Sequence, residues 1–265
     1  MVRTVKILIP VKYTIDVSQL KFDESTKQPL LDACPKAMGD ADKCAVEEAL
    51  RIKEKLGGTT AVVSIISGDE GLRVIRDAYA MGVDEGYAVY HPEAERLDAL
   101  SIARIIAGVY RAKGPYDLIL IGLASGDTHS GVVGPTLAAI LDIPVISGAD
   151  SLEVTDEGLV RAKCMMEDGT YVFEARTPAV VTVTTEINEP RIPTLKAILK
   201  SKKKPISKVE LKDIGLEGIS AGIEVLDAKK YEVPRKRVII DATDPSKIDE
   251  CIEKIVGLLR EEGVL

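Results

Sequence analysis

The sequence predicts an α/β fold with a doubly wound, mostly parallel sheet, an antiparallel hairpin insertion and an extended C-terminal arm. Almost continuous apolar runs, such as residues 5–9, 61–66 and 118–121, are typical of strands that are covered on both faces. Stretches with apolar residues at helical spacing separate these runs, and a strict alternation of strand and helix is typical of a parallel sheet. The 265 residues are enough to bury a full core.

The first half of the chain supplies most of the predicted elements. Residues 5–9 form the first strand, and the residues that follow it lack a strong period, which indicates a long loop or a short hairpin. A helix begins after residues 40–42, where Asp is a good N-cap, and ends at Gly57, with Glu47 and Arg51 on its outer side. Further strands are predicted over residues 61–66, 86–90, 117–121 and 144–147, and further helices over residues 72–79, 97–110 and 136–141.

The alternation breaks near residue 152. Turn residues at 156–158 and 167–169 predict two antiparallel hairpin units within about residues 151–175. Met165 and Met166 are expected to pack within these hairpins rather than to contact a cofactor. Residues 179–184 then return to the central sheet as a strand.

The C-terminal region has fewer apolar patterns. A short helix is predicted over residues 194–200, a strand over 238–240 and an amphipathic helix over 248–259. Residues 206–237 are too sparse in apolar positions for a core of their own, so they are expected to form an arm on another surface, for which a second subunit is one candidate. The predicted division is an α/β nucleotide-binding domain over residues 1–205 and an arm with a helix over residues 206–265.

The composition excludes several classes of protein. The formal net charge of −7 argues against general nucleic-acid binding, which needs a surplus of Lys and Arg. Because the sequence lacks an apolar run of about 18 residues and its N-terminal apolar segment is too short for a secretory signal, a cytoplasmic chain without membrane insertion is expected. The four cysteines form no C-x-x-C pair, so free thiols are expected rather than a metal site.

A glycine-rich turn from strand to helix is the strongest candidate for a binding site. Residues 122–135 connect the apolar strand at 118–121 to the helix at 136–141. Such a turn directs backbone N–H groups and a helix N-terminus at one point, which suits a phosphate. The same residue types also occur in ordinary turns, and the loop matches neither a Walker A sequence nor a G-x-G-x-x-G fingerprint. Both interpretations fit the loop on this pattern alone.

The position of the loop in the sheet favours a binding role. Because the carboxyl ends of parallel strands meet at one edge, Pro10, Ile66 and Gly122 are expected to lie near one another. The sequence shows no Ser-His-Asp, Cys-His or paired-carboxylate arrangement with enough support to name, so no catalytic side chain is predicted. The basic residues within 196–204 are, on their own, most simply explained as a solvated face.

Several stretches, taken in order, resemble the beta subunit of electron-transfer flavoprotein. The strongest is residues 186–204, EINEPRIPTLKAILKSKKK, which looks like the signature segment of that subunit. The other matching pieces are residues 5–12, 44–54, 80–84, 117–122 and 178–182. The resemblance covers about residues 1–205, and the order of the pieces makes it specific.

The resemblance implies a fold like that of the adenine-nucleotide alpha hydrolases and a heterodimer with an alpha subunit. The alpha subunit would hold the redox FAD in a shared cleft, and this chain would bind AMP or, as in electron-bifurcating relatives, a second FAD beside which NADH reacts. The sequence of residues 186–193 looks closer to that of prokaryotic and bifurcating members, which favours the second FAD. Acyl-CoA dehydrogenase-type or quinone-oxidoreductase-type proteins would be the redox partners.

The resemblance also implies site residues by position. The cofactor contacts would be Pro10, Gly39, Asp40, Ala41, Asp42, Ile66, Gly122, Leu123, Gly126, Asp127, Thr128, His129, Ser130, Gly131, Val132 and Val133. The helix at 194–200 resembles a recognition loop that docks electron-transfer partners, with Leu195 as its apolar anchor. The docking residues would be Thr194, Leu195, Lys196, Ile198 and Lys200. Apolar contact supplies affinity in such a surface, and charge speeds the encounter.

Two departures from the family pattern affect the nucleotide. Gly39-Asp40 stands where the family has Asn-Pro, and DTHSGVV at residues 127–133 stands where many members have DGDTAQV. Recognition would then depend on backbone N–H groups, Ser130 and His129, for which an ordinary exposed histidine is the alternative.

Two other functions stay open on the sequence. One is an ATP-using α/β enzyme with the same phosphate loop, which would need a metal-binding acid and a lysine at the phosphates. Asp127 is the obvious acid in the loop, and it has no adjacent lysine in the sequence. The other is an assembly subunit with an empty pocket.

Overall fold

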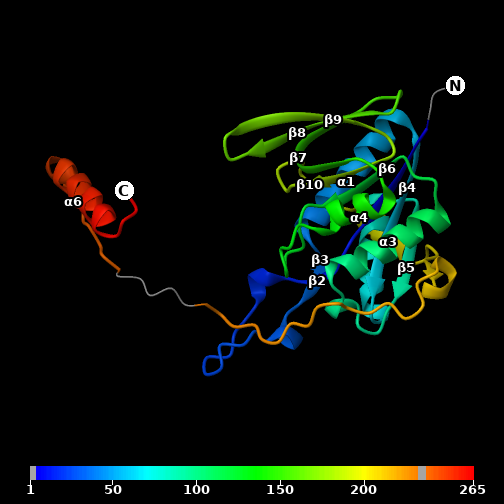
Figure 1. Cartoon of the computed structure of the whole chain (residues 1–265), viewed down its shortest axis with the longest axis horizontal. Coiled ribbons are helices and arrows are strands. Elements are labelled where there is room, and N and C mark those ends of the chain that lie inside the picture. Colours follow the sequence, from blue (N-terminus) through cyan, green and yellow to red (C-terminus); the bar gives the residue numbers. More distant parts are fainter. Residues whose placement is uncertain (1–3, 232–236) are drawn as a thin grey trace. The chain divides into compact units, whose positions relative to one another are not determined.

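The structure, a computed structural model, describes residues 4–231 and 237–265. The chain forms two compact units, one that ends at Lys229 and one that begins at Lys230. The first is a sheet with helices on both faces, and the second contains α6 (Ile248–Glu261) (Figure 1). Residues 1–3 and 232–236, which fall in the predicted N-terminal domain and the predicted arm, lie outside the described residues.

The sheet of the first unit confirms the predicted fold class. Within the described residues it has nine strands in the order β11-β5-β4-β1-β6-β10-β7-β8-β9. The pairs from β11 to β7 are parallel, and β8 and β9 continue the sheet as antiparallel strands. The bounds are β1 (Val5–Pro10), β4 (Gly58–Ile66), β5 (Glu85–Tyr90), β6 (Leu118–Gly122), β7 (Val145–Val154), β8 (Leu159–Met166), β9 (Gly169–Arg176), β10 (Ala179–Val183) and β11 (Ser207–Val209).

Helices cover both faces of the parallel strands. α1 (Asp40–Leu56) and α2 (Leu72–Met81) contribute to one apolar core, and α3 (Ala99–Lys113) and α4 (Val133–Leu141) contribute to the other. The short helix α5 (Leu195–Ser201) packs beside α2. The segment before α1, for which the sequence predicts a loop or a short hairpin, pairs β2 (Tyr13–Ile15) with β3 (Lys36–Met38) in a small antiparallel sheet.

The path of the chain creates a switch point between β1 and β6. From β1 the chain passes through α1 to β4 and then to β5 on one side, and after α3 it crosses to β6 on the other side of β1. The loops that leave β1 and β6 therefore diverge. Open α/β sheets bind ligands in the crevice outside the carboxyl ends of strands at such a point.

The hairpin insertion and the return strand are also where the sequence predicts them. β7 pairs with β8 and β8 pairs with β9, and β10 returns between β6 and β7. Met165 and Met166 do not pack within these hairpins, because they are 73% and 43% exposed. Met165 and Met166 lie at the end of β8, next to the edge strand β9, whose residues are mostly exposed. Within the described residues, no helix or second sheet covers the two methionines.

Two expectations about α1 are wrong. Its N-cap is Gly39, which has no side chain to cap the helix, and the carboxylate of Asp42 accepts a hydrogen bond from the backbone of Lys12. Glu47 does not lie on the outer side, since it is 4% exposed and binds Arg191. Buried charge is costly unless it is paired. Glu47 pairs with Arg51 at the spacing the sequence indicates (3.1 Å), and it also pairs with Arg191, which lies too far away in the sequence for helical spacing to indicate it.

Two features of the C-terminal region also differ from the sequence pattern. Residues 238–240, which the structure describes, form no strand, and Ile239 is 90% exposed. This apolar run has no strand edge to pair with, since the regular structure among the described residues of its unit is a 3-10 turn and α6. The start of the predicted arm lies on the α/β unit itself, where β11 pairs with β5 and Ser101 Oγ donates to the backbone oxygen of Ser220 (2.8 Å).

Gly134→Ala is predicted to destabilise the fold by about 1–3 kcal/mol, the usual cost of overpacking a core. Gly134 lies in the first turn of α4, and a Cβ there would overlap Thr182 Cγ2 in β10. Urea denaturation followed by circular dichroism measures the change. The matched control is Gly257→Ala in α6, where a Cβ would meet nothing within 4 Å. Equal unfolding free energies for Gly134→Ala and the wild type would contradict the prediction.

Candidate functional site

Asp42 joins the two loops that frame the switch point. Its carboxylate Oδ2 accepts a hydrogen bond from the backbone N–H of Lys12, just after β1 (2.8 Å), and it also accepts one from the backbone N–H of Gly122 at the end of β6. A Cβ at position 122 would lie 2.6 Å from Asp42 Oδ1 and 2.9 Å from Ala41 Cβ. Position 122 therefore has to be glycine for the first turn of α1 to approach β6 this closely.

The environment of Asp42 disfavours its charge. The residue is 8% exposed, and burial raises the pKa of its carboxyl to about 6. The hydrogen bonds from Lys12 and Gly122 and the positive charge of Lys12 act in the opposite direction, and nearby Asp127 adds to the increase. Asp42 is thus a hydrogen-bond acceptor for the protein backbone, and a phosphate would be repelled by its ionised form.

An ion pair also links the two loops at the switch point. Lys12 Nζ forms an ion pair with Asp127 Oδ2 at 2.6 Å, which links the loop after β1 to the loop after β6. Burial alone would raise the pKa of Asp127, but hydrogen bonds from Lys12 and Ser125 hold it at about 2. The sequence analysis missed Lys12 as a site residue. Its position directly after a central strand was the signal that could have indicated it.

The loop after β6 uses several of its own N–H groups. The backbone N–H of Leu123 donates to Val183 O (2.8 Å), that of Thr128 to Asp127 Oδ1 (2.7 Å) and that of His129 to Ser125 O (3.0 Å). With the N–H of Gly122 donating to Asp42, four of the predicted amide contacts are engaged within the protein. The N–H groups of Gly126, Asp127 and residues 130–133 remain for a ligand, and those of residues 130–133 lead directly into the first turn of α4.

The end of the loop has the backbone geometry of an anion site. His129 and Gly131 have positive φ angles of 47° and 65°, and Val132, the N-cap of α4, is in the right-handed helical region. Alternation of left-handed and right-handed residues brings successive N–H groups to one concave side, which suits an anion. The N–H groups of the first turn of α4 add to this arrangement, because a helix leaves them without an intrahelical acceptor.

The remaining predicted cofactor residues differ in what they can offer. Pro10 and Ile66 are buried at the ends of β1 and β4, and the carbonyl of Ile66 accepts the N–H of His91 (2.9 Å). The side chain of Asp40 is 82% exposed and pairs with Lys43 (2.8 Å). Gly126, Ser130 and His129 lie exposed on the loop after β6. The structure therefore brings Ala41, Asp42, Gly122 and Asp127 together, and leaves Asp40 on the outer surface of α1.

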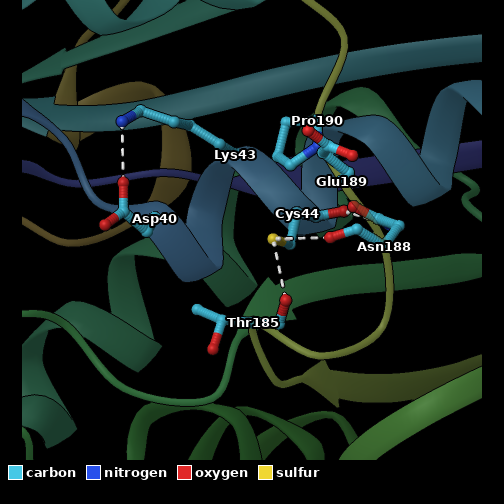
Figure 2. Close-up of a pocket in the computed structure, with 7 residues that line it drawn as sticks. All are labelled: Asp40, Lys43, Cys44, Thr185, Asn188, Glu189 and Pro190. Carbon is cyan, nitrogen blue, oxygen red and sulfur yellow. Dashed lines mark hydrogen bonds and ion pairs between the residues drawn. The ribbon is translucent and has the colours of Figure 1, made fainter.

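A cavity of about 540 Å³ lies beside the start of α1 (Figure 2). It is lined by Asp40, Lys43 and Cys44 of α1 and by Thr185, Asn188, Glu189 and Pro190 of the segment after β10. Cys44 Sγ lies 3.8 Å from Thr185 O and 3.7 Å from Asn188 O, and Asn188 Nδ2 donates to Cys44 O (3.0 Å). The sequence pattern did not predict that this segment borders the same helix end as the switch-point loops.

The predicted docking helix forms as α5. The Oγ1 of Thr194 caps it by accepting the N–H of Ala197 (3.2 Å), as the sequence predicts. Leu195 is 73% exposed and Ile198 40% exposed, and Lys196 and Lys200 are exposed beside them. The helix therefore presents apolar side chains next to positive charge.

Comparison with known proteins identifies the family. The family model described as "Electron transfer flavoprotein domain" matches residues 32–214. The chain is 33% identical over 224 residues to "Electron transfer flavoprotein subunit beta" of Bacillus subtilis, covering 84% of this chain and 85% of that protein. The chain belongs to the electron transfer flavoprotein beta-subunit family.

Two further relatives show how far the likeness extends. The chain is 33% identical over 264 residues to "Electron transfer flavoprotein subunit beta" of Bradyrhizobium diazoefficiens, covering 98% of this chain and 100% of that protein. It is 28% identical over 267 residues to "Caffeyl-CoA reductase-Etf complex subunit CarD" of Acetobacterium woodii, again covering 98% and 100%. The likeness to these relatives therefore includes the C-terminal region.

Membership of the family implies association with flavin and pairing with an alpha subunit. Among the described residues, no helix has both the length and the apolar character needed to cross a membrane. In the same part of the chain, no group of three or more His, Cys, Asp or Glu side chains could hold a metal ion.

The raised pKa of Asp42 predicts a specific pH dependence. Because its folded-state pKa of about 6 lies above the ordinary value of 3.8, the folded state binds more protons between these values, and stability falls as the pH rises through this window. Relative to Asp42→Asn, the wild type is expected to lose about 2 kcal/mol of unfolding free energy between about pH 4 and pH 7. Urea titrations of both proteins across this range measure the difference. Parallel pH profiles would show that the pKa of Asp42 is not raised in the folded protein.

Proposed function

We propose that this chain binds an adenine nucleotide, either AMP or a second FAD, in the switch-point crevice, and pairs with an alpha subunit that holds the redox FAD. The observation that carries this proposal is the turn at residues 129–133, where left-handed Gly131 and right-handed Val132 lead directly into α4. The N–H groups of this turn converge where the helix dipole is positive, so they suit a phosphate group.

The charged residues around the turn shape the site rather than hold the phosphate. The ion pair of Lys12 with Asp127 neutralises the acid nearest to the turn, and it fixes the loop against β1. Asp42 occupies the N–H groups of Lys12 and Gly122, which are thereby unavailable to a ligand. In this proposal the phosphate binds at residues 130–133. The adenosine part lies toward Ala41 and the buried carboxyl end of β1 at Pro10.

The residues fit the cofactor chemistry expected of the family. A flavin supplies the electron chemistry when it is bound, so this chain needs to bind, orient and shield it rather than to provide an acid or a base. A second FAD in this chain would make reaction with NADH and electron bifurcation possible, and AMP would leave the complex as a simple carrier. The resemblance of residues 186–193 to bifurcating members favours the second FAD.

We also propose that α5 docks redox partners of the acyl-CoA dehydrogenase or quinone-oxidoreductase type. Leu195 and Leu199 are 73% and 55% exposed, and the lysines beside them would attract an acidic partner surface. The C-terminal segment would pack on the alpha subunit, because it exposes Ile223, Val225 and Leu226 at 71%, 80% and 88%.

The contact between Lys12 and Asp127 also gives the ATP-using alternative an acid beside a lysine, which the sequence pattern lacked. The alternative requires a bound magnesium ion at Asp127. Magnesium-dependent ATP hydrolysis by the purified chain without bound flavin would support this alternative. The absence of ATP hydrolysis by the flavin-containing heterodimer would exclude it.

The nucleotide content of the purified heterodimer decides between the cofactors. The complex of this chain with its alpha subunit is denatured, and the released FAD and AMP are counted by chromatography. Two FAD for each heterodimer would support bifurcation, and one FAD with one AMP would exclude it. A single FAD with no other adenine nucleotide would contradict the proposed site.

Gly131→Ala is predicted to weaken nucleotide binding to this chain by about tenfold. An alanine in the left-handed conformation costs about 1–2 kcal/mol, so the free loop relaxes away from the conformation that the bound phosphate requires. Calorimetric titration of nucleotide-free heterodimer with AMP and with FAD measures the affinity. Gly148→Ala is the matched control, since Gly148 has a similar φ angle of 77° and lies in β7 outside the loop. Equal affinities for both variants and the wild type would place the phosphate elsewhere.

A further inference from the structure

α5 is a short helix with little apolar burial. The helix has seven residues, and an isolated helix of this length is not stable in water. Its apolar side chains do not bury it either, because Leu195 is 73% and Leu199 is 55% exposed. Ile192, just before the helix, is 93% exposed. The Thr194 cap and the packing beside α2 contribute to its order, and polar contacts on both sides of the helix add to them.

Arg191 anchors the chain before α5. Its guanidinium donates to both carboxylate oxygens of Glu47 (2.7 and 3.1 Å) and to both of Glu54 (2.6 and 3.2 Å), and its backbone N–H donates to Glu47 Oε2 (3.1 Å). Glu47 is buried, and although burial opposes its charge, the hydrogen bonds from Arg191 lower its pKa. Bidentate contacts of this kind fix the orientation of the Arg191 side chain as well as its distance from the carboxylates.

A second set of contacts anchors the chain after α5. Arg76 Nη1 of α2 donates to the backbone oxygen of Lys202 (2.8 Å), and it lies 3.4 Å from that of Ser201. Lys204 Nζ donates to Val83 O (2.8 Å) and lies 4.5 Å from the centroid of the Tyr79 ring. Tyr79 Oη donates to the backbone oxygen of Pro205 (2.7 Å). Lys204 is therefore part of the fold, and it is not one of the free charges of the basic cluster.

We propose that these two anchors form a clamp that holds α5 ready for docking, and that Arg191 and Arg76 are positioning residues for partner binding. This inference rests on the proposed docking role of α5. A partner that meets a fixed helix does not have to order it on binding, so more of the contact energy appears as affinity. The exposed lysines Lys196, Lys200, Lys202 and Lys203 beside exposed Leu195 and Leu199 fit an apolar pocket rimmed by carboxylates, which the proposed docking role places on a redox protein.

Hydrogen exchange of the heterodimer tests the clamp without any partner. Arg191→Ala and Arg76→Ala are each expected to speed exchange of the backbone amides of residues 195–201 by about tenfold, because local opening becomes easier. Arg73→Ala is the matched control on α2, where Arg73 is 64% exposed and faces Asp77 at 3.8 Å. Unchanged exchange in α5 for both anchor variants would overturn the clamp. Arg76→Ala keeps the test valid if Arg191→Ala fails to fold, because it leaves no buried charge unpaired.

Electron transfer from a substrate-reduced acyl-CoA dehydrogenase tests the positioning role. Both anchor variants are expected to raise the KM for the heterodimer by about fivefold with kcat retained at saturation, since α5 must be reordered on binding. Arg191→Lys should restore part of the KM, and the flavin spectrum should not change. Faster exchange with an unchanged KM would overturn the positioning role.

The failure of the docking role is distinguishable from the failure of the clamp. If Leu195→Ala leaves KM unchanged, or the wild type accepts no electrons from this dehydrogenase, the proposed docking function fails and the positioning role fails with it. The exchange measurement still decides whether the clamp exists.

Discussion

The hydrogen bonds that Asp42 accepts hold the candidate nucleotide site together. One carboxylate in the first turn of α1 binds the N–H groups of Lys12 and Gly122, which belong to loops that leave neighbouring strands in opposite directions. Without an acceptor between them these loops would leave buried N–H groups unsatisfied, at a cost of about 1–3 kcal/mol each. The close approach excludes a side chain at position 122, and it leaves the end of the loop after β6 as the part that can meet a ligand.

The same helix organises the second functional region. Asp42 lies in the first turn of α1, Glu47 in its second and Glu54 near its end, and the last two bind Arg191 ahead of the docking helix. Cys44, between Asp42 and Glu47 in the sequence, contacts the backbone oxygen of Asn188 through Sγ, and Asn188 Nδ2 donates to the backbone oxygen of Cys44. α1 therefore contacts both regions from different sides, with Asp42 toward the proposed nucleotide crevice and Cys44, Glu47 and Glu54 toward the segment that leads to α5.

Local pattern was sufficient to predict the fold, and it failed where contacts are long-range. Apolar runs gave the parallel strands, turn residues gave the hairpins, and Thr194 gave the start of α5, since each depends on residues close in the sequence. Glu47 appeared to be a surface residue because its partner Arg191 is 144 positions away, and Asp42 appeared to be a helix cap because its partners lie in two other loops. Lys12 was missed for the same reason. The hydrophobic run at 238–240 formed no strand, because pattern cannot supply a pairing edge.

The most direct test of the account is an experimental structure of the heterodimer with its bound nucleotide. The account predicts phosphate oxygens within hydrogen-bond distance of the backbone N–H groups of residues 131–133, with the Asp42 carboxylate still accepting from Lys12 and Gly122. It would be contradicted by a crevice filled with packed side chains, or by a phosphate bound away from this turn while the N–H groups of residues 131–133 face solvent.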